Sequence, residues 1–443
     1  MTPPSSAAVL GGEMTESKEY FEKRALKRGT VSWVLLMSLG VAYVISGDFS
    51  GWNYGIAHGG WFGMLIAFLV MGAMYLFMVL GLAEMSSAMP TAGAGYGFAR
   101  RAMGKVGGAL TGFAILIEYT ICPAAISTFI AAYVQALGIF PDVPSAAIIG
   151  VFFIVFVGIH LIGVGEALKI IFGITAIAVV ALIAFFVGIA PHFEFSNLFN
   201  ITPTATDGST LLPFGAAGVI SALPFGIWLF LAIEGVPLAA EESANPKRDM
   251  PKGIIGAMLV LVVFGALVLF LTAGGAGAGF AGEASAPLVD ALNEVGEGSL
   301  ATFVNYAGLA GLVASFFSTV FSGSRQAFAL SRAGYLPKFL SVTGSRKTPY
   351  VALLILGGIA FLLAAIVQNG DILLNMAVFA ACVSYAMMNL SHIILRKKEP
   401  NMERGFKAPG GIVLTSISFL LSIVAIISTF TVDAFAASCT LGV

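Results

Sequence analysis

Three acidic residues, Asp48, Glu118 and Glu234, stand in stretches that are otherwise apolar enough to cross a lipid bilayer. A charged side chain at the centre of a membrane helix costs on the order of 3 kcal/mol on insertion scales. Two such carboxylates near each other would compensate an ammonium group or a metal cation far better than they would tolerate another carboxylate. These residue types therefore predict a site for a cation or for the cationic end of a larger molecule.

The sequence around two of the acids interrupts a helix. Asp48 lies in "ISGDFSGWNYG", between glycines and serines, and Glu234 lies in "WLFLAIEGVPLAAEE", where Gly235 and Pro237 follow it. Proline removes a helical donor, and irregular backbone at membrane depth is tolerated only where it lines a cavity or is buried in protein. Both stretches are therefore predicted to be binding loops. For Glu118, in "AILIEYTICPAAI", a protonated carboxyl that pins helices together is the alternative.

Four aromatic residues lie close in sequence to the acids: Trp52, Tyr119, Trp228 and Phe230. An aromatic face can cover an ammonium group by a cation–π contact. Simple packing is the alternative for each of them. Trp228, about one and a half helical turns before Glu234, is the one best placed to cover a ligand.

Composition identifies the surroundings of these residues as lipid. Of the 443 residues, 58% are hydrophobic and 10% are charged, and the mean hydropathy is +0.96. Soluble domains carry about 25% charged residues, so the chain is an integral membrane protein. Apolar runs of about 18 to 25 residues predict eleven spans, near residues 31-57, 61-83, 107-138, 144-163, 167-190, 214-240, 254-275, 300-324, 350-368, 371-395 and 411-432.

The basic residues indicate the orientation. All 22 Lys and Arg lie in or beside the N-terminal tail and the loops on one side, near residues 84-106, 164-169, 241-253, 325-349 and 396-410. By the positive-inside rule this side, with the N-terminus, is cytoplasmic. We expect a multi-pass protein of the cell (inner) membrane. The three cysteines suit neither a disulfide framework nor a metal site, and no cofactor or metal is expected.

The order of the spans relates the two broken helices. Asp48 lies in the first span and Glu234 in the sixth. If the chain consists of two similar halves of five spans each, the second half crosses the membrane in the opposite direction to the first, because five is an odd number. Paired broken helices at matching places in two halves are the best sequence pointer to the central site of a transporter.

Three loop motifs then resemble one family, the amino acid-polyamine-organocation (APC) permeases. They are "AEMSSAMPTAGAGYGFARRAMG" from residue 83, "AAEESANPKRDMPKGI" from residue 239 and "SRQAFALSRAGYLPKFL" from residue 324. The resemblance extends from about Gly29 to Ala408. Within the superfamily, "ISGDFSGWNYG", "ILIEYTICPAAI", "HLIGVGEALKI" and "WLFLAIEGVPLAAEE" most closely resemble the bacterial ethanolamine permeases.

The resemblance implies an all-α, LeuT-like fold with two inverted five-helix repeats and discontinuous helices 1 and 6 around a midplane site. The implied division is a cytoplasmic tail 1-30, a first repeat 31-190, an extracellular loop 191-213, a second repeat 214-395, and a cytoplasmic loop with helix 11 over 396-443. Family members usually have twelve spans, so the twelfth is expected to be missing or truncated. Helices 11 and 12 lie outside the repeats, so the transport core is expected to survive.

The resemblance also carries over binding positions. Ser46, Gly47 and Asp48 match the unwound part of helix 1, Phe230 to Gly235 match that of helix 6, and Trp228 matches an aromatic that closes over substrate in some relatives. The expected substrate-binding residues are Ser46, Gly47, Asp48, Glu118, Tyr119, Trp228, Phe230, Ala232, Ile233, Glu234 and Gly235.

Asp48 is a departure from the family pattern, because a small residue is expected at its position. This departure argues against an ordinary α-amino acid and favours ethanolamine, a protonated amine with a hydroxyl and no carboxylate. The expected function is import of a small organic amine by alternating access. The alternative is a cationic amino acid or polyamine permease or exchanger.

The coupling ion is left open by the sequence. Some family members carry in helix 5 a lysine that substitutes for sodium, and "IFGITAIAVVAL" from residue 171 has none. Ser315, Ser318 and Thr319 could supply hydroxyls to a sodium site, although hydroxyls in membrane helices usually bond their own backbone or a neighbouring helix. Proton coupling through one of the three acids, uniport and exchange are the other possibilities.

Other functional classes fit the sequence less well. An intramembrane enzyme needs a constellation such as His-Glu-x-x-His, which the chain lacks. A channel favours continuous pore-lining helices, whereas two helices here are broken. The expected partners are a small cationic amine and the lipid bilayer, with no nucleic acid, and the oligomeric state is left open.

Overall fold

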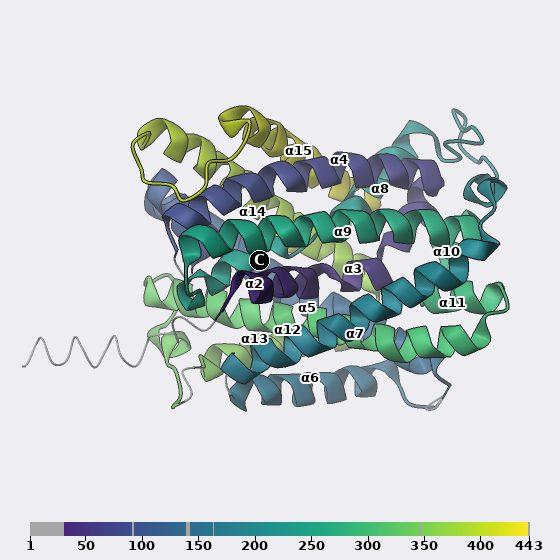
Figure 1. Cartoon of the computed structure of the whole chain (residues 1–443), viewed down its shortest axis with the longest axis horizontal. Coiled ribbons are helices and arrows are strands. Elements are labelled where there is room, and N and C mark those ends of the chain that lie inside the picture. The colour runs from purple at the N-terminus through teal and green to yellow at the C-terminus, as the bar shows by residue number, and fades with distance from the viewer. Residues whose placement is uncertain (1–30, 91–92, 139–141, 163, 346–347, 442–443) are drawn as a thin grey trace, which may run out of the picture.

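The computed structural model describes residues 31–90, 93–138, 142–162, 164–345 and 348–441. The predicted cytoplasmic tail, residues 1-30, lies outside them. The described chain forms a bundle of helices that run in one general direction (Figure 1). Helices are expected here because hydrocarbon offers no hydrogen bonds to the backbone, so each segment must satisfy its own. Among the described residues, β-pairing is limited to an isolated bridge between Val31 and Ser243.

The first span is built in three pieces. Helix α2 (Trp33–Val44) is followed by the short helix α3 (Ser46–Phe49), and α4 (Trp52–Ala88) begins after an interruption. The interruption consists of Ser50, which is extended, and Gly51, whose φ of 97° favours glycine. Helix α4 kinks at Gly60, with φ 71°, and this kink separates the first and second predicted spans.

The position of this break corrects one expectation. Ser46, Gly47 and Asp48 were expected to be unwound, but they belong to α3. Backbone bonds hold this turn, because the Asp48 N–H donates to the Ile45 carbonyl (3.1 Å) and the Ser50 N–H donates to the Ser46 carbonyl (3.0 Å). The chain leaves the helix only at Gly51, where the missing side chain permits a positive φ.

The next helices complete the first half of the bundle. Helix α5 (Ala94–Ala136) kinks at Gly104 and carries Glu118 and Tyr119 near the middle of its membrane-spanning part. Helices α6 (Ser145–Ile162) and α7 (Val164–Ile189) follow. Two short 3-10 turns, η1 (Ala190–His192) and η2 (Phe195–Phe199), lead into the second half.

The sixth span is broken as predicted. Helix α8 (Gly215–Trp228) ends in an irregular turn, and the 3-10 helix η3 (Ile233–Glu242) continues the span. Ala232 closes the turn with φ 80°, a left-handed conformation that is uncommon for a residue with a side chain. Pro237 lies inside η3 and supplies no N–H, which accords with a segment that does not return to a regular α-helix.

The remaining elements form the second half and the end of the described chain. They are α9 (Pro246–Ala276), α10 (Ala278–Glu283), α11 (Pro287–Glu294), α12 (Gly298–Arg332), η4 (Lys338–Ser341), α13 (Tyr350–Val367), α14 (Gly370–Lys398), α15 (Gly411–Val432) and α16 (Ala434–Leu441). Within the described residues, nine helices are long and apolar enough to span a membrane. Two shorter apolar helices, residues 33–49 and 145–161, account for the other two predicted spans, so the polytopic all-α fold is confirmed.

The broken helices lie in the interior of the bundle. Helix α2 packs against α9, α7, α12 and η3, and α8 lies beside α4. Helix α14 packs on α5 on one side and on α15 on the other. In Figure 1, α6 and α15 lie on opposite edges of the bundle, while α2 and α3 lie between them. This arrangement brings η3 against α5 and α4, and the candidate site forms there.

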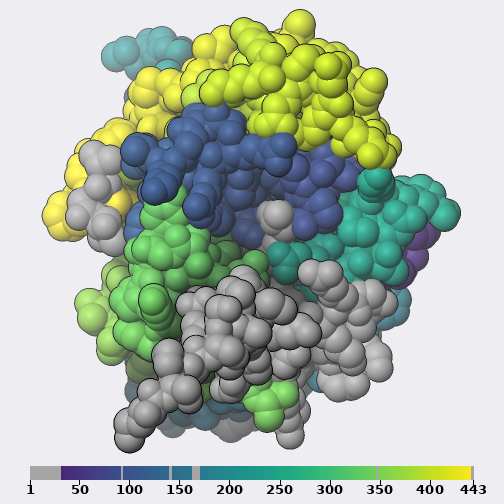
Figure 2. All heavy atoms as spheres, turned by 90° about the vertical axis from the view of Figure 1, so that its left-hand side faces the viewer, coloured from purple at the N-terminus to yellow at the C-terminus, as the bar shows by residue number. Residues whose placement is uncertain are grey.

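Ion pairs lie at the end of the bundle that carries residues 84–90, 93–106, 241–253, 325–345 and 396–410, here called the basic end and shown in Figure 2. Arg101 pairs with Glu399 (2.7 Å), and this guanidinium holds the pKa of the Glu399 carboxyl below its usual value. Glu84 is buried and forms an ion pair with Arg404 (2.8 Å). These ion pairs join the segment near residue 84 and the segment near residue 101 to the loop at 396–410.

Candidate functional site

Glu118 and Glu234 meet in the middle of the bundle. Glu118 comes from α5, and Glu234 is the second residue of η3, directly after the break in the sixth span. Their carboxyl groups lie within hydrogen-bonding reach of each other. Glu118 is fully buried and Glu234 is 4% exposed. We call these two groups the carboxyl pair.

Tyrosines hold one oxygen of each acid. The Tyr119 hydroxyl donates to Glu234 Oε1 (3.0 Å), and the Tyr385 hydroxyl donates to Glu118 Oε1 (3.4 Å). The Tyr75 hydroxyl in turn donates to that of Tyr385 (2.9 Å). The other oxygens, Glu118 Oε2 and Glu234 Oε2, are buried and have no hydrogen-bond partner within the described chain. Each acid of the pair therefore has one oxygen that no donor of the described chain reaches.

The two carboxyl oxygens without a donor indicate which chemical groups the site can bind. Adjacent carboxylates in a low-dielectric interior cannot both stay charged unless a proton or a cation joins them. The buried guanidinium of Arg325 is already paired with Glu242 (3.0 Å). The aromatic ring of Phe230 packs on Tyr75 with centroids 5.5 Å apart and adds an apolar wall beside the tyrosines. A group that satisfies these oxygens must be a hydrogen-bond donor or a cation, and an ammonium group is both.

Gly235 lets the Tyr119 hydroxyl approach. A Cβ at this position would lie 2.7 Å from that hydroxyl and 2.9 Å from the Tyr43 ring. The backbone of Ala232, in the turn that precedes η3, accepts a second, longer bond from the same hydroxyl (3.4 Å). Ile233 is fully buried at the start of η3. The expected helix 6 residues thus gather around Glu234.

Trp228 closes the site on the side away from the basic end. Its indole N–H donates to the Ser50 carbonyl (2.9 Å), and its ring meets Phe129 edge-on with centroids 5.8 Å apart. A Cβ on Gly51 would lie 2.5 Å from the indole nitrogen. Trp228 is 2% exposed, and its bond to Ser50 joins the two helix breaks.

A second closure lies toward the basic end. Ser322 donates to the Tyr43 hydroxyl (2.5 Å). Arg325 and Glu242 form an ion pair with both side chains almost fully buried, and the guanidinium lies 3.7 Å from the centroid of the Phe321 ring. These contacts join α2, α12 and the end of η3, and both acids of the carboxyl pair are buried.

Asp48 lies apart from the carboxyl pair. Its side chain is fully buried, and neither carboxylate oxygen has a hydrogen-bond partner among the described residues. One oxygen faces α9, where a Cβ on Gly265 would lie 3.7 Å away. The Trp52 indole donates to the backbone carbonyl of Asp48 (3.2 Å) and leaves its carboxylate untouched.

The other expected helix 1 residues serve close packing. Ser46 donates to the Ser315 hydroxyl (2.8 Å), and Ser315 donates to the Tyr43 carbonyl. A Cβ on Gly47 would lie 2.8 Å from the Trp228 carbonyl, so the break of the sixth span touches α3 there.

The hydroxyls considered for sodium bond mostly within their own helix. Ser318 donates to the Ala314 carbonyl (2.7 Å), and Thr319 donates to the Ser315 carbonyl (2.9 Å). Ser315 alone of the three reaches helix 1. This arrangement matches the alternative that such hydroxyls bond the backbone.

Tyr43, Tyr75 and Tyr385 are site residues that the sequence reasoning missed. They come from α2, α4 and α14, and each is buried within a membrane-spanning stretch. A signal was present in the sequence, because a tyrosine deep in a membrane helix needs a partner for its hydroxyl. Their convergence on two glutamates depends on helix packing that one sequence does not reveal.

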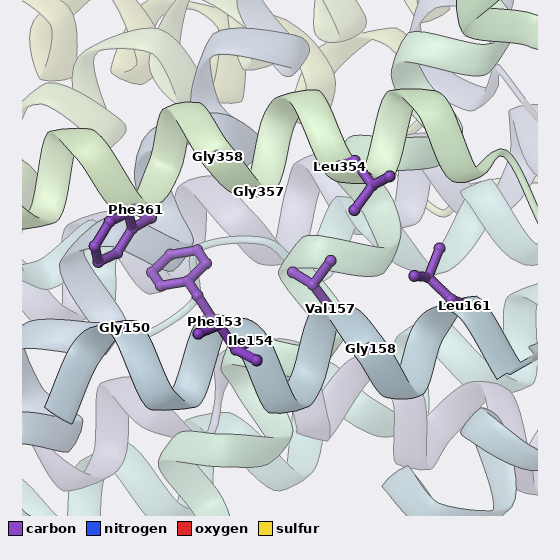
Figure 3. A pocket seen from close by; sticks show the side chains of 10 residues that line it. All are labelled: Gly150, Phe153, Ile154, Val157, Gly158, Leu161, Leu354, Gly357, Gly358 and Phe361. Carbon is purple, nitrogen blue, oxygen red and sulfur yellow. The ribbon is translucent and has the colours of Figure 1, made fainter. Parts of the chain in front are cut away.

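A separate apolar groove lies between α6 and α13 (Figure 3). Phe153 and Val157 from α6 face Leu354 and Phe361 from α13 across it, and its lining residues are glycines and hydrophobic residues. A groove without polar groups cannot orient a polar substrate, so the carboxyl pair is the stronger candidate site.

Comparison with known proteins places the chain in a sequence context. The family profile described as amino acid permease matches residues 34–441. The branched-chain amino acid permease BcaP of Bacillus subtilis (strain 168) is 28% identical over 387 residues, which cover 83% of this chain and 80% of that protein. The methylthioribose transporter of the same organism is 28% identical over 390 residues (83% and 79%). An uncharacterized transporter of Rhizobium meliloti (strain 1021) is 26% identical over 405 residues (89% and 85%).

Proposed function

Since this chain belongs to the amino acid permease family, we propose that it is a secondary transporter that imports a small organic amine, with ethanolamine as the favoured substrate. Family membership makes it a multi-pass membrane transporter of a small organic substrate rather than an enzyme. Family membership does not identify the substrate, because the similar proteins are named for branched-chain amino acids and for methylthioribose.

The carboxyl pair is the observation that carries the proposal. An ammonium group presents three N–H donors and one positive charge. Glu118 Oε2 and Glu234 Oε2 offer two buried acceptors without partners, and an ammonium between them would replace the missing countercharge. A substrate carboxylate would instead enter a space that already holds two acids. Ethanolamine carries the first group and lacks the second.

The basic end indicates how the protein is oriented in the membrane. Lys and Arg prefer the cytoplasmic side of a membrane protein, so we place the basic end in the cytoplasm and the chain in the cell membrane. Substrate then enters past Trp228 and leaves past Tyr43 and the Arg325–Glu242 pair. Because both closures are formed here, alternating access requires each to open in turn.

An amino acid or polyamine permease is the second candidate. The amino acid permease among the similar proteins favours it. A proton shared within the carboxyl pair would also remove one negative charge and make a substrate carboxylate easier to accept.

Ligand-induced thermal stabilisation tests the proposal. A ligand that binds only the folded protein raises its unfolding free energy by about 2.7 kcal/mol at one hundred times Kd. The purified protein is heated with ethanolamine, choline, putrescine, arginine, alanine or glycine, each with and without sodium. We expect ethanolamine to stabilise it and alanine and glycine to leave it unchanged. Stabilisation by alanine or arginine without stabilisation by ethanolamine would instead support the second candidate.

A further inference from the structure

A cavity with two arginines lies at the basic end, between the start of α5 and the end of α12. Its volume is about 300 Å³, and its lining includes Tyr96, Gly97 and Arg100 of α5 and Ala329 and Arg332 of α12. In Figure 2 the start of α5 (blue) lies beside the end of α12 (green). We propose that this cavity, here called the arginine cavity, binds a phosphate group, which belongs either to a free phosphate compound or to an anionic lipid.

Residues of all three loop motifs come together at the arginine cavity, although these motifs contribute neither acid of the carboxyl pair. The first motif supplies Arg100, and the third supplies Arg332. The second motif supplies Glu241, whose carboxylate lies 3.6 Å from the Arg332 guanidinium. Segments far apart in the sequence therefore converge on one basic cavity, and the proposed transport function leaves this convergence unexplained.

Aromatic side chains orient both guanidinium groups. Arg100 Nη1 donates to the Tyr96 hydroxyl (2.7 Å), and the Arg100 guanidinium lies 5.9 Å from the centroid of the Tyr335 ring. The Arg332 guanidinium lies 5.3 Å from the centroid of the Phe328 ring. Contacts of a guanidinium with a ring face restrict its orientation without using the N–H donors at its edge. Both groups are thus held in place before a ligand binds, which lowers the entropy cost of binding.

Positive charge is in excess at the arginine cavity. Among the described residues, the hydrogen-bond partner of the Arg100 side chain is the neutral Tyr96 hydroxyl, whereas Arg332 pairs with the Glu241 carboxylate. Two guanidinium groups that line one small cavity repel each other, and an anion between them relieves this repulsion. Arginine binds phosphate oxygens through two parallel N–H···O bonds. The volume of the cavity lies at the lower end of the range for small-molecule sites, which suits a single phosphate group.

The arginine cavity is also close to the lipid-facing surface. Tyr335, whose ring lies by Arg100, donates its hydroxyl to the Lys105 carbonyl (2.8 Å). The next residue, Val106, is 72% exposed, and Leu110, one turn further along α5, is 57% exposed. Apolar side chains exposed on a membrane helix face acyl chains, and basic pockets between helices on the cytoplasmic side bind anionic headgroups. A lipid phosphate and a dissolved phosphate compound are therefore the two sources to distinguish.

Thermal unfolding of the purified full chain tests the site, because a ligand that binds only the folded protein raises its thermal midpoint. The first probe is sodium phosphate, compared in detergent with sodium chloride at equal ionic strength. The second probe is phosphatidylglycerol, mixed in equal parts with phosphatidylcholine in nanodiscs and compared with phosphatidylcholine alone. We expect at least one probe to raise the midpoint. A rise with phosphate alone indicates a free phosphate compound as the ligand, and a rise with phosphatidylglycerol alone indicates a lipid headgroup.

Arg100→Gln removes one guanidinium from the cavity, and Arg101→Gln is its matched control. Arg101 is the next residue, its loss changes the net charge equally, and it pairs with Glu399 (2.7 Å) outside the cavity. For phosphate, we expect Arg100→Gln to raise the concentration that gives half-maximal stabilisation by about tenfold or more. In nanodiscs, Arg100→Gln should lose the shift caused by phosphatidylglycerol. Arg101→Gln should respond like the wild type in both assays.

The proposal is overturned if neither probe stabilises the wild-type protein beyond its chloride or phosphatidylcholine reference. It is equally overturned if Arg100→Gln and Arg101→Gln respond alike, since the effect would then be a general attraction to a basic surface. Arg332→Gln takes the place of Arg100→Gln if the latter is not recovered folded, and the wild-type comparison with the reference decides if neither is. Stabilisation by ethanolamine is measured separately, so failure of the arginine cavity leaves the proposed transport function untouched.

Discussion

Replacing Glu234 with glutamine removes one charge from the carboxyl pair and keeps the shape of the side chain. The Tyr119 hydroxyl can still donate to the amide oxygen, so the local packing is expected to survive. Removing one partner of a buried, hydrogen-bonded charge pair costs about 2–5 kcal/mol of binding. Because Glu118 still supplies a second carboxyl, we expect a loss near the lower end, about 2–3 kcal/mol, or about 30- to 150-fold in Kd.

Titration calorimetry of the purified protein with ethanolamine measures this change. The thermal midpoint without ligand should stay the same or rise, because one of two crowded acids has become neutral. Glu403→Gln is the control, since it makes the same chemical change on a side chain that is 84% exposed at the basic end. We expect that control to alter Kd less than about twofold, as exposed ion pairs contribute little. A folded Glu234→Gln variant that binds within threefold of wild type would refute the role of the carboxyl pair.

Two further substitutions test the closures. Gly51→Ala forces a Cβ to within 2.5 Å of the Trp228 indole at a positive φ, whereas Gly296→Ala meets a similar φ (83°) in open space. Backbone strain should cost each variant about 1–2 kcal/mol of unfolding free energy. Only Gly51→Ala should lose uptake, and equal uptake in the two variants would contradict this reasoning. Arg325→Met leaves Glu242 buried and unpaired and should cost about 3–5 kcal/mol of unfolding free energy. The double change with Glu242→Leu should recover most of that loss in thermal unfolding, and additive losses would show that the two residues do not act as a pair.

Much of the architecture could be predicted because lipid imposes strict rules on a chain. Apolar length marked eleven spans, and the structure has helices at all of them within the described residues. Gly235 and Pro237 marked the break in the sixth span, because glycine and proline act on the backbone locally. In the first span the same reasoning located the break about one turn early, since a run with two glycines does not show which of them adopts the positive φ.

The candidate site was only partly predictable. Glu118, Tyr119 and Glu234 were singled out because polar groups at membrane depth are costly. The sequence does not show which of the acids come into contact. Residues adjacent in sequence point in different directions from a helix, and the partner of each side chain depends on how the helices cross. The structure brings Glu234 to Glu118 rather than to Asp48, and it adds tyrosines from α2, α4 and α14.

The sequence by itself determined that this chain is a multi-pass membrane protein with two broken spans and three buried acids. Hydropathy reflects the preference of a segment for lipid over water, and glycine and proline act on the local backbone, so neither effect depends on distant residues. Only the tertiary structure decided that two acids form the carboxyl pair while Asp48 faces the apolar surface of α9. That division depends on contacts between residues more than one hundred positions apart, and such contacts arise from the packing of whole helices.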